Sequence, residues 1–135
     1  MKKIIILLAL VFMSFSNEPK HSLTIEISGL KTNKGTVLVG IYNSEKTFLS
    51  KPVMGRVEKV TGKTVTLTFT DVPKGVYAVS LFQDENNNGT LDTGMFGIPT
   101  EKYGFSNNAK GFMSAPSFDK AKFELKNNQT IKIKI

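Results

Sequence analysis

Apolar and polar residues alternate in several short runs along the chain. The clearest runs are SLTIEIS (22–28), TVLVGIY (36–42), KTVTLTF (63–69), KFEL (122–125) and TIKIKI (130–135). A period of two is typical of strands with one buried face, because successive side chains of a strand point to opposite faces of the sheet. A further short strand is predicted within KPVMGRVEKV (51–60). The pattern therefore predicts a protein built from short strands.

VYAVSLF (76–82) is apolar at nearly every position. Strands of this kind are covered on both faces, so this run is predicted to be a central strand. Lys132 and Lys134 alternate with isoleucines, and such lysines protect an edge strand from pairing with a neighbour. The best helix candidate is a single turn, SEKTFL (44–49), with Ser44 as its N-cap. Together these elements predict an all-β fold, an antiparallel immunoglobulin-like or transthyretin-like β-sandwich of about seven strands.

The first residues, MKKIIILLALVFMSFS, combine two lysines, an apolar run over residues 4–13 and small residues at Ser14 and Ser16. This layout is typical of a secretory signal peptide, and we expect cleavage after Ser16. The apolar run is too short to span a bilayer, which takes about 20 apolar residues. We therefore expect a signal peptide over residues 1–16 and a single domain over residues 17–135. The expected location is extracytoplasmic, periplasmic or secreted, with no membrane span after cleavage.

Composition excludes several kinds of site. The chain has no cysteine, which excludes disulfides, zinc-thiolate sites and cysteine nucleophiles. Without Lys2 and Lys3 the formal charge falls from +7 to +5, and the remaining basic residues are scattered. Scattered charge favours a solvated surface over a dedicated polyanion site, and no nucleic-acid partner is expected. The sole histidine, His21, lies beside the expected cleavage site, where chain ends are usually mobile, which argues against histidine-based catalysis or metal binding.

DENNNGTLD (84–92) has the spacing of a calcium loop. Oxygen-bearing side chains recur at every second position, and Gly89 permits a tight turn. The candidate ligands are the side chains of Asp84, Asn86, Asn88 and Asp92 and the backbone carbonyl of Thr90. An EF-hand would place a glutamate where Met95 stands, and two of the ligands are neutral amides, so the prediction is weak, structural Ca²⁺ binding with a Kd of about 10⁻⁴ to 10⁻³ M. The alternative is a polar turn without an ion, because Asn and Asp collect in turns.

A long insertion rich in Gly, Asn and aromatic residues runs from residue 84 to residue 118. Segments of this length inside a compact domain usually serve a function or conceal short elements of their own. The candidate ligand-binding residues within it are Phe96, Tyr103, Phe105, Asn107, Asn108 and Phe112. Exposed aromatic faces and amides would suit a carbohydrate or peptide ligand. Alternatively, the aromatics fold inward and anchor the loop, and the two asparagines cap its backbone.

Two stretches, VPKGVYAVSLFQDENNNGTLD (72–92) and FGIPTEKYGFSNNAKG (96–111), resemble the bacterial domain-of-unknown-function family 2141. The resemblance spans residues 22–135. It implies a signal peptide followed by a single extracytoplasmic β-sandwich related to immunoglobulin-like or transthyretin-like domains. It assigns no activity and no role to any residue.

The residues favour a binding or envelope-structural protein over an enzyme. Asp84 paired with Asp92 or Glu101 offers the two carboxylates of a glycosidase, but the same acids are better explained as ion ligands. The prediction is thus a non-catalytic β-sandwich with a calcium loop. The alternative is a carbohydrate- or peptide-binding module using residues 96–118, and a glycosidase-type enzyme is a third option. Exposure distinguishes the first two, because a binder needs several of the aromatics exposed whereas the structural interpretation needs them buried.

Overall fold

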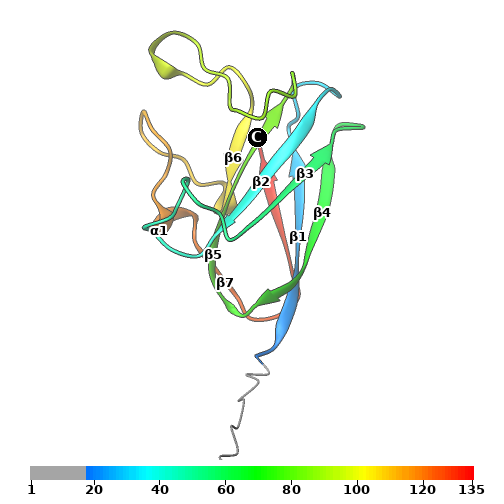
Figure 1. Cartoon of the computed structure of the whole chain (residues 1–135), viewed down its shortest axis with the longest axis vertical. Helices are drawn as coiled ribbons and strands as arrows, with labels where there is room; N and C mark the ends of the chain where they lie inside the picture. Colours follow the sequence, from blue (N-terminus) through cyan, green and yellow to red (C-terminus); the bar gives the residue numbers. More distant parts are fainter. Residues whose placement is uncertain (1–17) are drawn as a thin grey trace, which may run out of the picture.

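Two β-sheets pack face to face in the computed structural model, which describes residues 18–135 (Figure 1). The strands are β1 (Lys20–Ser28), β2 (Thr36–Tyr42), β3 (Met54–Lys59), β4 (Val65–Pro73), β5 (Gly75–Asp84), β6 (Tyr103–Phe105), β7 (Phe123–Leu125) and β8 (Gln129–Lys134). Three short helical segments are η1 (Met95–Gly97), η2 (Ser106–Asn108) and α1 (Phe118–Ala121). The predicted signal peptide, residues 1–16, and its cleavage site lie outside the described residues. Among residues 18–135, no helix has the length and apolar character needed to cross a membrane.

The first sheet has the strand order β4-β1-β8, and the second has the order β3-β2-β5-β6, with β7 also paired to β5. All of these pairs are antiparallel except β1 and β8, which run parallel with Leu23 beside Gln129. The prediction of a wholly antiparallel sandwich is therefore wrong at this pair. The reason is the connection between β7 and β8. β7 lies beside the start of β5 in the second sheet, so the chain crosses to the first sheet and enters it beside the start of β1.

The core lies between the two sheets and is built from the alternating apolar residues of the predicted strands. It includes Leu23, Ile25, Ile27, Val37, Val39, Ile41, Val65, Leu67, Phe69, Val79, Leu81 and Ile133. Removing this apolar area from water stabilises the fold by roughly 25 cal/mol per Å². The inward faces predicted from the period of two are confirmed. β5 is also confirmed as a central strand, with β2 on one edge and β6 and β7 on the other.

The long insertion holds more regular structure than the sequence predicted. β6 lies within it and adds a strand to the second sheet, so the described chain has eight strands rather than about seven. Three residues with a central glycine show no alternation of their own, which is why the pattern misses this strand. Gly104 is required there, because a Cβ would lie 2.6 Å from Cγ2 of Ile135. SEKTFL forms turns rather than the expected helix, although Ser44 Oγ accepts the Thr47 N–H as a cap would.

Ser106 ties the insertion to the sheet. Its hydroxyl oxygen accepts the Val79 N–H of β5 at 2.9 Å, and its O–H donates to the carbonyl of Ala121 in α1. The serine side chain is buried. A buried hydroxyl with both bonds made holds the end of β6, β5 and α1 in one arrangement, and this arrangement carries the surface described below.

Replacing Ser106 by alanine should lower the free energy of unfolding by about 1–3 kcal/mol, because the buried Val79 N–H and Ala121 carbonyl lose their partner. Chemical denaturation of the variant and of the wild type measures the difference. Ser114→Ala is the matched control, since Ser114 is exposed and bonds only within its own loop. Equal stability of the two variants would show that the buried hydroxyl does not hold the insertion.

Candidate functional site

The 84–92 loop begins where β5 ends, and its first residue organises it. The Asp84 carboxylate is buried. Its Oδ1 accepts the Asn88 N–H at 3.2 Å, and its Oδ2 accepts the Gly89 N–H at 2.7 Å. Gly89 has a φ of +80°, which a residue with a side chain adopts only with strain. Asp84 therefore closes the turn through the backbone, as an Asx-type motif does.

The other predicted ligands gather on Asp92. Asn86 Nδ2 donates to Asp92 Oδ2 at 2.6 Å, and Asn88 Nδ2 donates to Asp92 Oδ1. The Thr90 N–H donates to Asn88 Oδ1 at 3.1 Å. The structure thus brings four of the predicted oxygen-bearing side chains into one loop. Within residues 18–135, no three His, Cys, Asp or Glu side chains form a group suited to a metal ion, so an ion here would depend on the amide and carbonyl oxygens as well.

Glu101 closes the same loop from the other side. Its Oε2 accepts the Glu85 N–H and its Oε1 accepts the Asp92 N–H, each at 2.8 Å. Only 7% of this residue's surface is exposed. The sequence marked Glu101 as an acid near the loop, but its sixteen-residue separation from Glu85 gives no hint of this pairing. Glu101 therefore braces the loop instead of pointing its carboxylate into a cleft.

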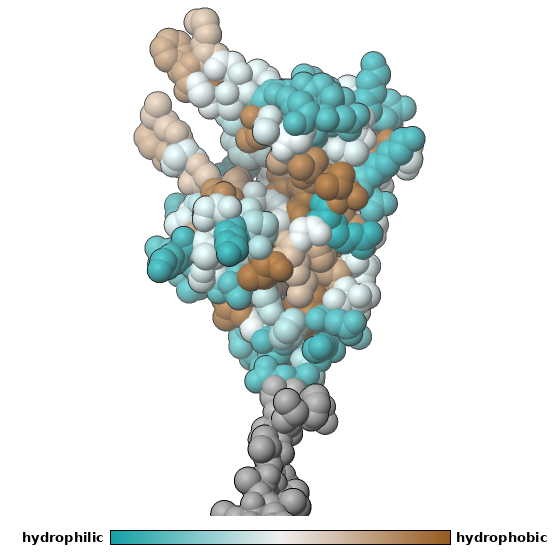
Figure 2. Space-filling view, viewed as in Figure 1, coloured by the Kyte–Doolittle hydropathy of each residue, from teal (hydrophilic) through white to brown (hydrophobic). Residues whose placement is uncertain are grey.

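A hairpin directly follows the 84–92 loop, which we call the braced loop because Glu101 closes it. Thr93 and Pro99 form an isolated bridge, the Gly94 N–H donates to the Ile98 carbonyl at 2.8 Å, and the Thr100 N–H donates to the Asp92 carbonyl at 2.8 Å. We call residues 94–98 the first tip loop. A second projection, residues 111–115, is the second tip loop. Figure 2 shows two apolar projections extending from one side of the molecule, apart from its polar upper surface.

A groove of about 710 Å³ lies between the tip loops, over the outer face of the second sheet. Its sheet residues include Ser80 and Phe82 of β5 and Tyr103 and Phe105 of β6. Tyr42 also lines it, and burial raises the pKa of its phenol above the ordinary value of 10.0, so this hydroxyl stays protonated at neutral pH. The lining is mainly aromatic and aliphatic, with few polar groups, which is the composition of many ligand sites.

The aromatics of the insertion divide into two groups. Phe96 is 92% exposed, Phe112 is 89% exposed and Tyr103 is 45% exposed. Phe105 is buried, and Phe118 is partly buried beside it in the same small cluster. Phe48 packs against both rings, with centroid distances of 6.4 and 5.7 Å. Two aromatics thus anchor the insertion, whereas three face solvent.

The two predicted ligand-binding asparagines make structural bonds. Asn107 Nδ2 donates to the carbonyls of Lys120 and Lys122, at 3.1 and 2.8 Å. Asn108 Oδ1 accepts the Lys134 N–H of β8 at 2.9 Å. Both asparagines have a positive φ, which Asn tolerates better than most residues. Of the two alternatives left open by the sequence, the bonds match the one in which these amides cap backbone groups.

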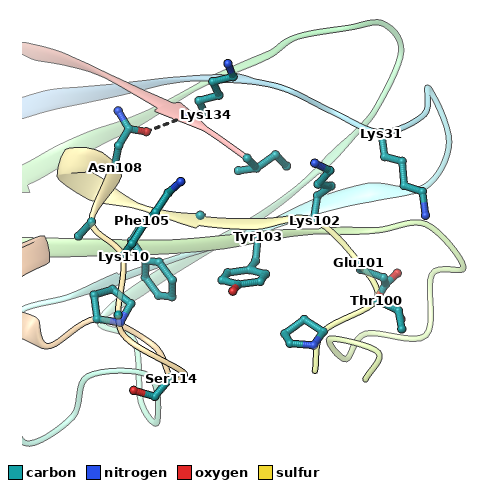
Figure 3. A pocket seen from close by; sticks show the side chains of 16 residues that line it. Lys31, Thr100, Glu101, Lys102, Tyr103, Phe105, Asn108, Lys110, Ser114 and Lys134 are labelled. Carbon is teal, nitrogen blue, oxygen red and sulfur yellow. Dashed lines mark hydrogen bonds between the residues drawn. The ribbon is translucent and has the colours of Figure 1, made fainter. Parts of the chain in front are cut away.

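A second, basic pocket of about 770 Å³ lies along β6 (Figure 3). Four lysines line it: Lys31, Lys102, Lys110 and Lys134. No local sequence pattern predicts this cluster, because the four lysines come from separate segments that only the fold brings together. Tyr103 and Phe105 border both the groove and this pocket. An apolar surface therefore adjoins a basic one across a single short strand.

Replacing Glu101 by glutamine should lower the free energy of unfolding by about 1–3 kcal/mol, because one of two partly buried N–H groups would face an amide NH₂ instead of an oxygen. Hydrogen exchange at the Glu85 and Asp92 amides should accelerate, whereas exchange in β1 should change less. Glu124→Gln is the control, since this exposed glutamate pairs only with Lys126. Unchanged exchange at both amides would contradict the bracing role.

Comparison with known proteins identifies the family but no characterised relative. The family model described as an uncharacterized protein conserved in bacteria (DUF2141) matches residues 25–133. No curated protein and no solved structure matches the chain. The match covers most of the chain and includes both sheets, the braced loop and the two tip loops. The chain therefore belongs to the DUF2141 family.

Proposed function

We propose that the protein is an extracytoplasmic, non-catalytic binding domain whose ligand lies in the groove between the two tip loops. The observation that supports this most is an apolar groove lined by the exposed rings of Phe96 and Tyr103, with Phe112 exposed on the adjoining second tip loop. Large apolar side chains in contact with water are unfavourable unless a partner covers them. This function is the binding-module alternative that the sequence left open. The ligand is a molecule with an apolar or aromatic face.

The buried acids support a role outside catalysis. All four carboxylate oxygens of Asp84 and Glu101 accept backbone N–H groups, so neither acid stands ready for proton transfer or nucleophilic attack. His21 lies in β1 beside Val72, near the start of β5, whereas the 84–92 loop follows the end of that strand (Figure 1). The extracytoplasmic location rests on the signal-peptide composition of residues 1–16.

The 84–92 loop is proposed as a weak, structural calcium site at the base of the first tip loop. Its support is the convergence of Asn86 and Asn88 on the Asp92 carboxylate. Rotation of each amide about its Cβ–Cγ bond exchanges NH₂ for oxygen, so an ion bound near Asp92 could recruit two further oxygen ligands. Glu101 keeps the loop closed in either case, and the ion would add rigidity to the hairpin that stands on it.

The fold is further proposed to be related to immunoglobulin-like or transthyretin-like domains. The support is a pair of facing sheets with a core of alternating residues from both. An experimental structure would test this relationship by showing whether β1 and β8 pair in parallel.

The groove is testable with anilinonaphthalene sulfonate, an aromatic anion whose fluorescence rises in apolar sites. We expect saturable binding that weakens by about fivefold in Ser80→Gln, because the longer side chain fills the groove floor. Thr66→Gln is the matched control, since Thr66 is an exposed strand residue on the other sheet. The groove proposal fails if the dye does not saturate, or if both variants bind it as the wild type does.

Calcium should raise the melting temperature of the chain from residue 17 onward. At ten times the Kd, a single site stabilises the fold by about 1.4 kcal/mol. The shift should be absent in Asp92→Asn, which removes the carboxylate charge from the loop, and unchanged in Thr90→Ala, which keeps the backbone carbonyl. Magnesium serves as the comparison ion. No shift at tens of millimolar calcium would identify DENNNGTLD as an ion-independent turn.

A further inference from the structure

We propose that the two tip loops dock the domain onto the surface of an anionic lipid bilayer, with the lysines of the basic pocket contacting the headgroups. The inference deepens the proposed function and rests on it in one respect, that the tip loops form a single binding site. It adds the identity of the partner, a lipid surface that offers both apolar chains and negative charge.

The tip loops carry an unusual concentration of exposed apolar side chains. Ten large apolar residues are exposed among residues 18–135, and half of them lie here: Met95, Phe96, Ile98, Phe112 and Met113. Phe96 and Met113 are each 92% exposed. Twelve residues, 99–110, separate the two loops in the sequence, yet Figure 2 shows their apolar ends on the same side of the molecule. Because these side chains make almost no contact with the protein, packing within the domain does not account for them.

The backbone at each tip favours the same conclusion. Phe96 has a φ of +61° and Met113 a φ of +55°. Bulky residues rarely adopt this left-handed conformation, and a position needing only a turn would accept Gly or Asn at lower cost. Both loops place a large apolar residue at such a position. The turn alone therefore does not explain these two residues, and the large apolar side chain is the feature that distinguishes them.

The charges around the tip loops suit an anionic surface. From Thr93 to Phe118 the only acid is Glu101, which is buried and bonded to backbone N–H groups. Lys102 and Lys110 lie in the same segment and line the basic pocket, which the bases of both tip loops border. Among the described residues, neither of these lysines, nor Lys134 beside them, is in a salt bridge. Positive charge near the tips is thus left without an acidic partner in the fold.

A bilayer fits these observations better than a protein surface does. The tips are separate projections, so a folded partner would need two pockets at a matching spacing, whereas acyl chains accept apolar side chains of any shape. Methionine, present in both tips, adapts readily to such surroundings. Interfacial segments bury their apolar side chains about 5–10 Å deep, and their binding grows with the buried apolar area and with the attraction of basic residues to anionic lipids. The tip loops and the basic pocket supply both.

Vesicle flotation tests the proposal with the chain from residue 17 onward, in EDTA so that the outcome does not depend on the calcium loop. We expect binding to vesicles containing phosphatidylglycerol, weaker binding to pure phosphatidylcholine, and loss of the difference at high salt. The double variant Phe96→Ser/Phe112→Ser should lower the partition coefficient at least about tenfold on both lipids. Val57→Ser is its control, because Val57 is an exposed apolar residue on β3 that lines neither the groove nor the basic pocket.

The lysine contribution has its own variant. Lys102→Ala/Lys110→Ala should reduce binding to anionic vesicles by about thirtyfold and leave binding to neutral vesicles unchanged, since two lysines near the surface contribute about 2 kcal/mol together. Lys74→Ala is the control, because Lys74 lies at the turn before β5, away from the loop that follows it. A lysine variant that binds both kinds of vesicle as the wild type does would overturn the headgroup contact.

The outcomes separate this proposal from the groove proposal. Saturable dye binding without vesicle binding overturns lipid docking and leaves the groove as a site for a soluble ligand. Vesicle binding without dye binding supports docking by the tips and overturns the groove. Self-association in sedimentation equilibrium without lipid, abolished by Phe96→Ser/Phe112→Ser, would assign the tips to a second copy of the chain and overturn lipid docking. Failure of both dye and vesicle binding overturns both proposals.

Discussion

Strand β5 is the element on which the second sheet and the long insertion depend, because three strands pair with it and the 84–92 loop begins at its end. It pairs with β2 along one edge and with β6 and β7 along the other. The Gln83 N–H donates to the Lys102 carbonyl, and the buried Gln83 amide accepts from Lys31 N–H and donates to the carbonyls of Thr32 and Lys34. The next residue, Asp84, closes the following loop. Through these hydrogen bonds, β5 links the packed core to the loops at its end.

Polar side chains anchor most of the insertion, and Phe105 and Phe118 add one small aromatic cluster. Glu101, Ser106, Asn107 and Asn108 each bond backbone groups on other segments, and Glu101 and Ser106 do so while buried. An unpaired backbone group in such a place would cost about 1–3 kcal/mol, so these bonds are specific requirements of the fold. Because they position the insertion, Phe96 and Phe112 are not needed as anchors. The polar bonds that position the insertion thus leave these large aromatic residues free to be exposed.

The surface around the tip loops combines an apolar groove and a basic pocket that meet at β6. Tyr103 and Phe105 border the apolar groove, and Gly104 between them lets the strand pack close to Ile133 of β8 and to the adjacent Ile135. β8 also brings Lys134 to the basic pocket. The close approach of β6 to β8 therefore sets the distance between apolar and basic surfaces. An amphipathic anion, or a surface made of such molecules, is the partner class that matches this juxtaposition.

The sequence by itself determined the strands of the sandwich other than β6, the central position of β5 and the polar turn over residues 84–92. These features depend on local periodicity and turn chemistry, which are properties of neighbouring residues. The parallel pairing of β1 with β8, the strand β6, the bracing by Glu101 and the four-lysine pocket were decided only in the tertiary structure. Each of these features brings together segments that are far apart in the chain, and no local sequence pattern predicts such contacts. The roles of the aromatics and asparagines also could not be assigned from residue type, because an amide or a ring serves as anchor or as surface according to which backbone groups and side chains the fold places beside it.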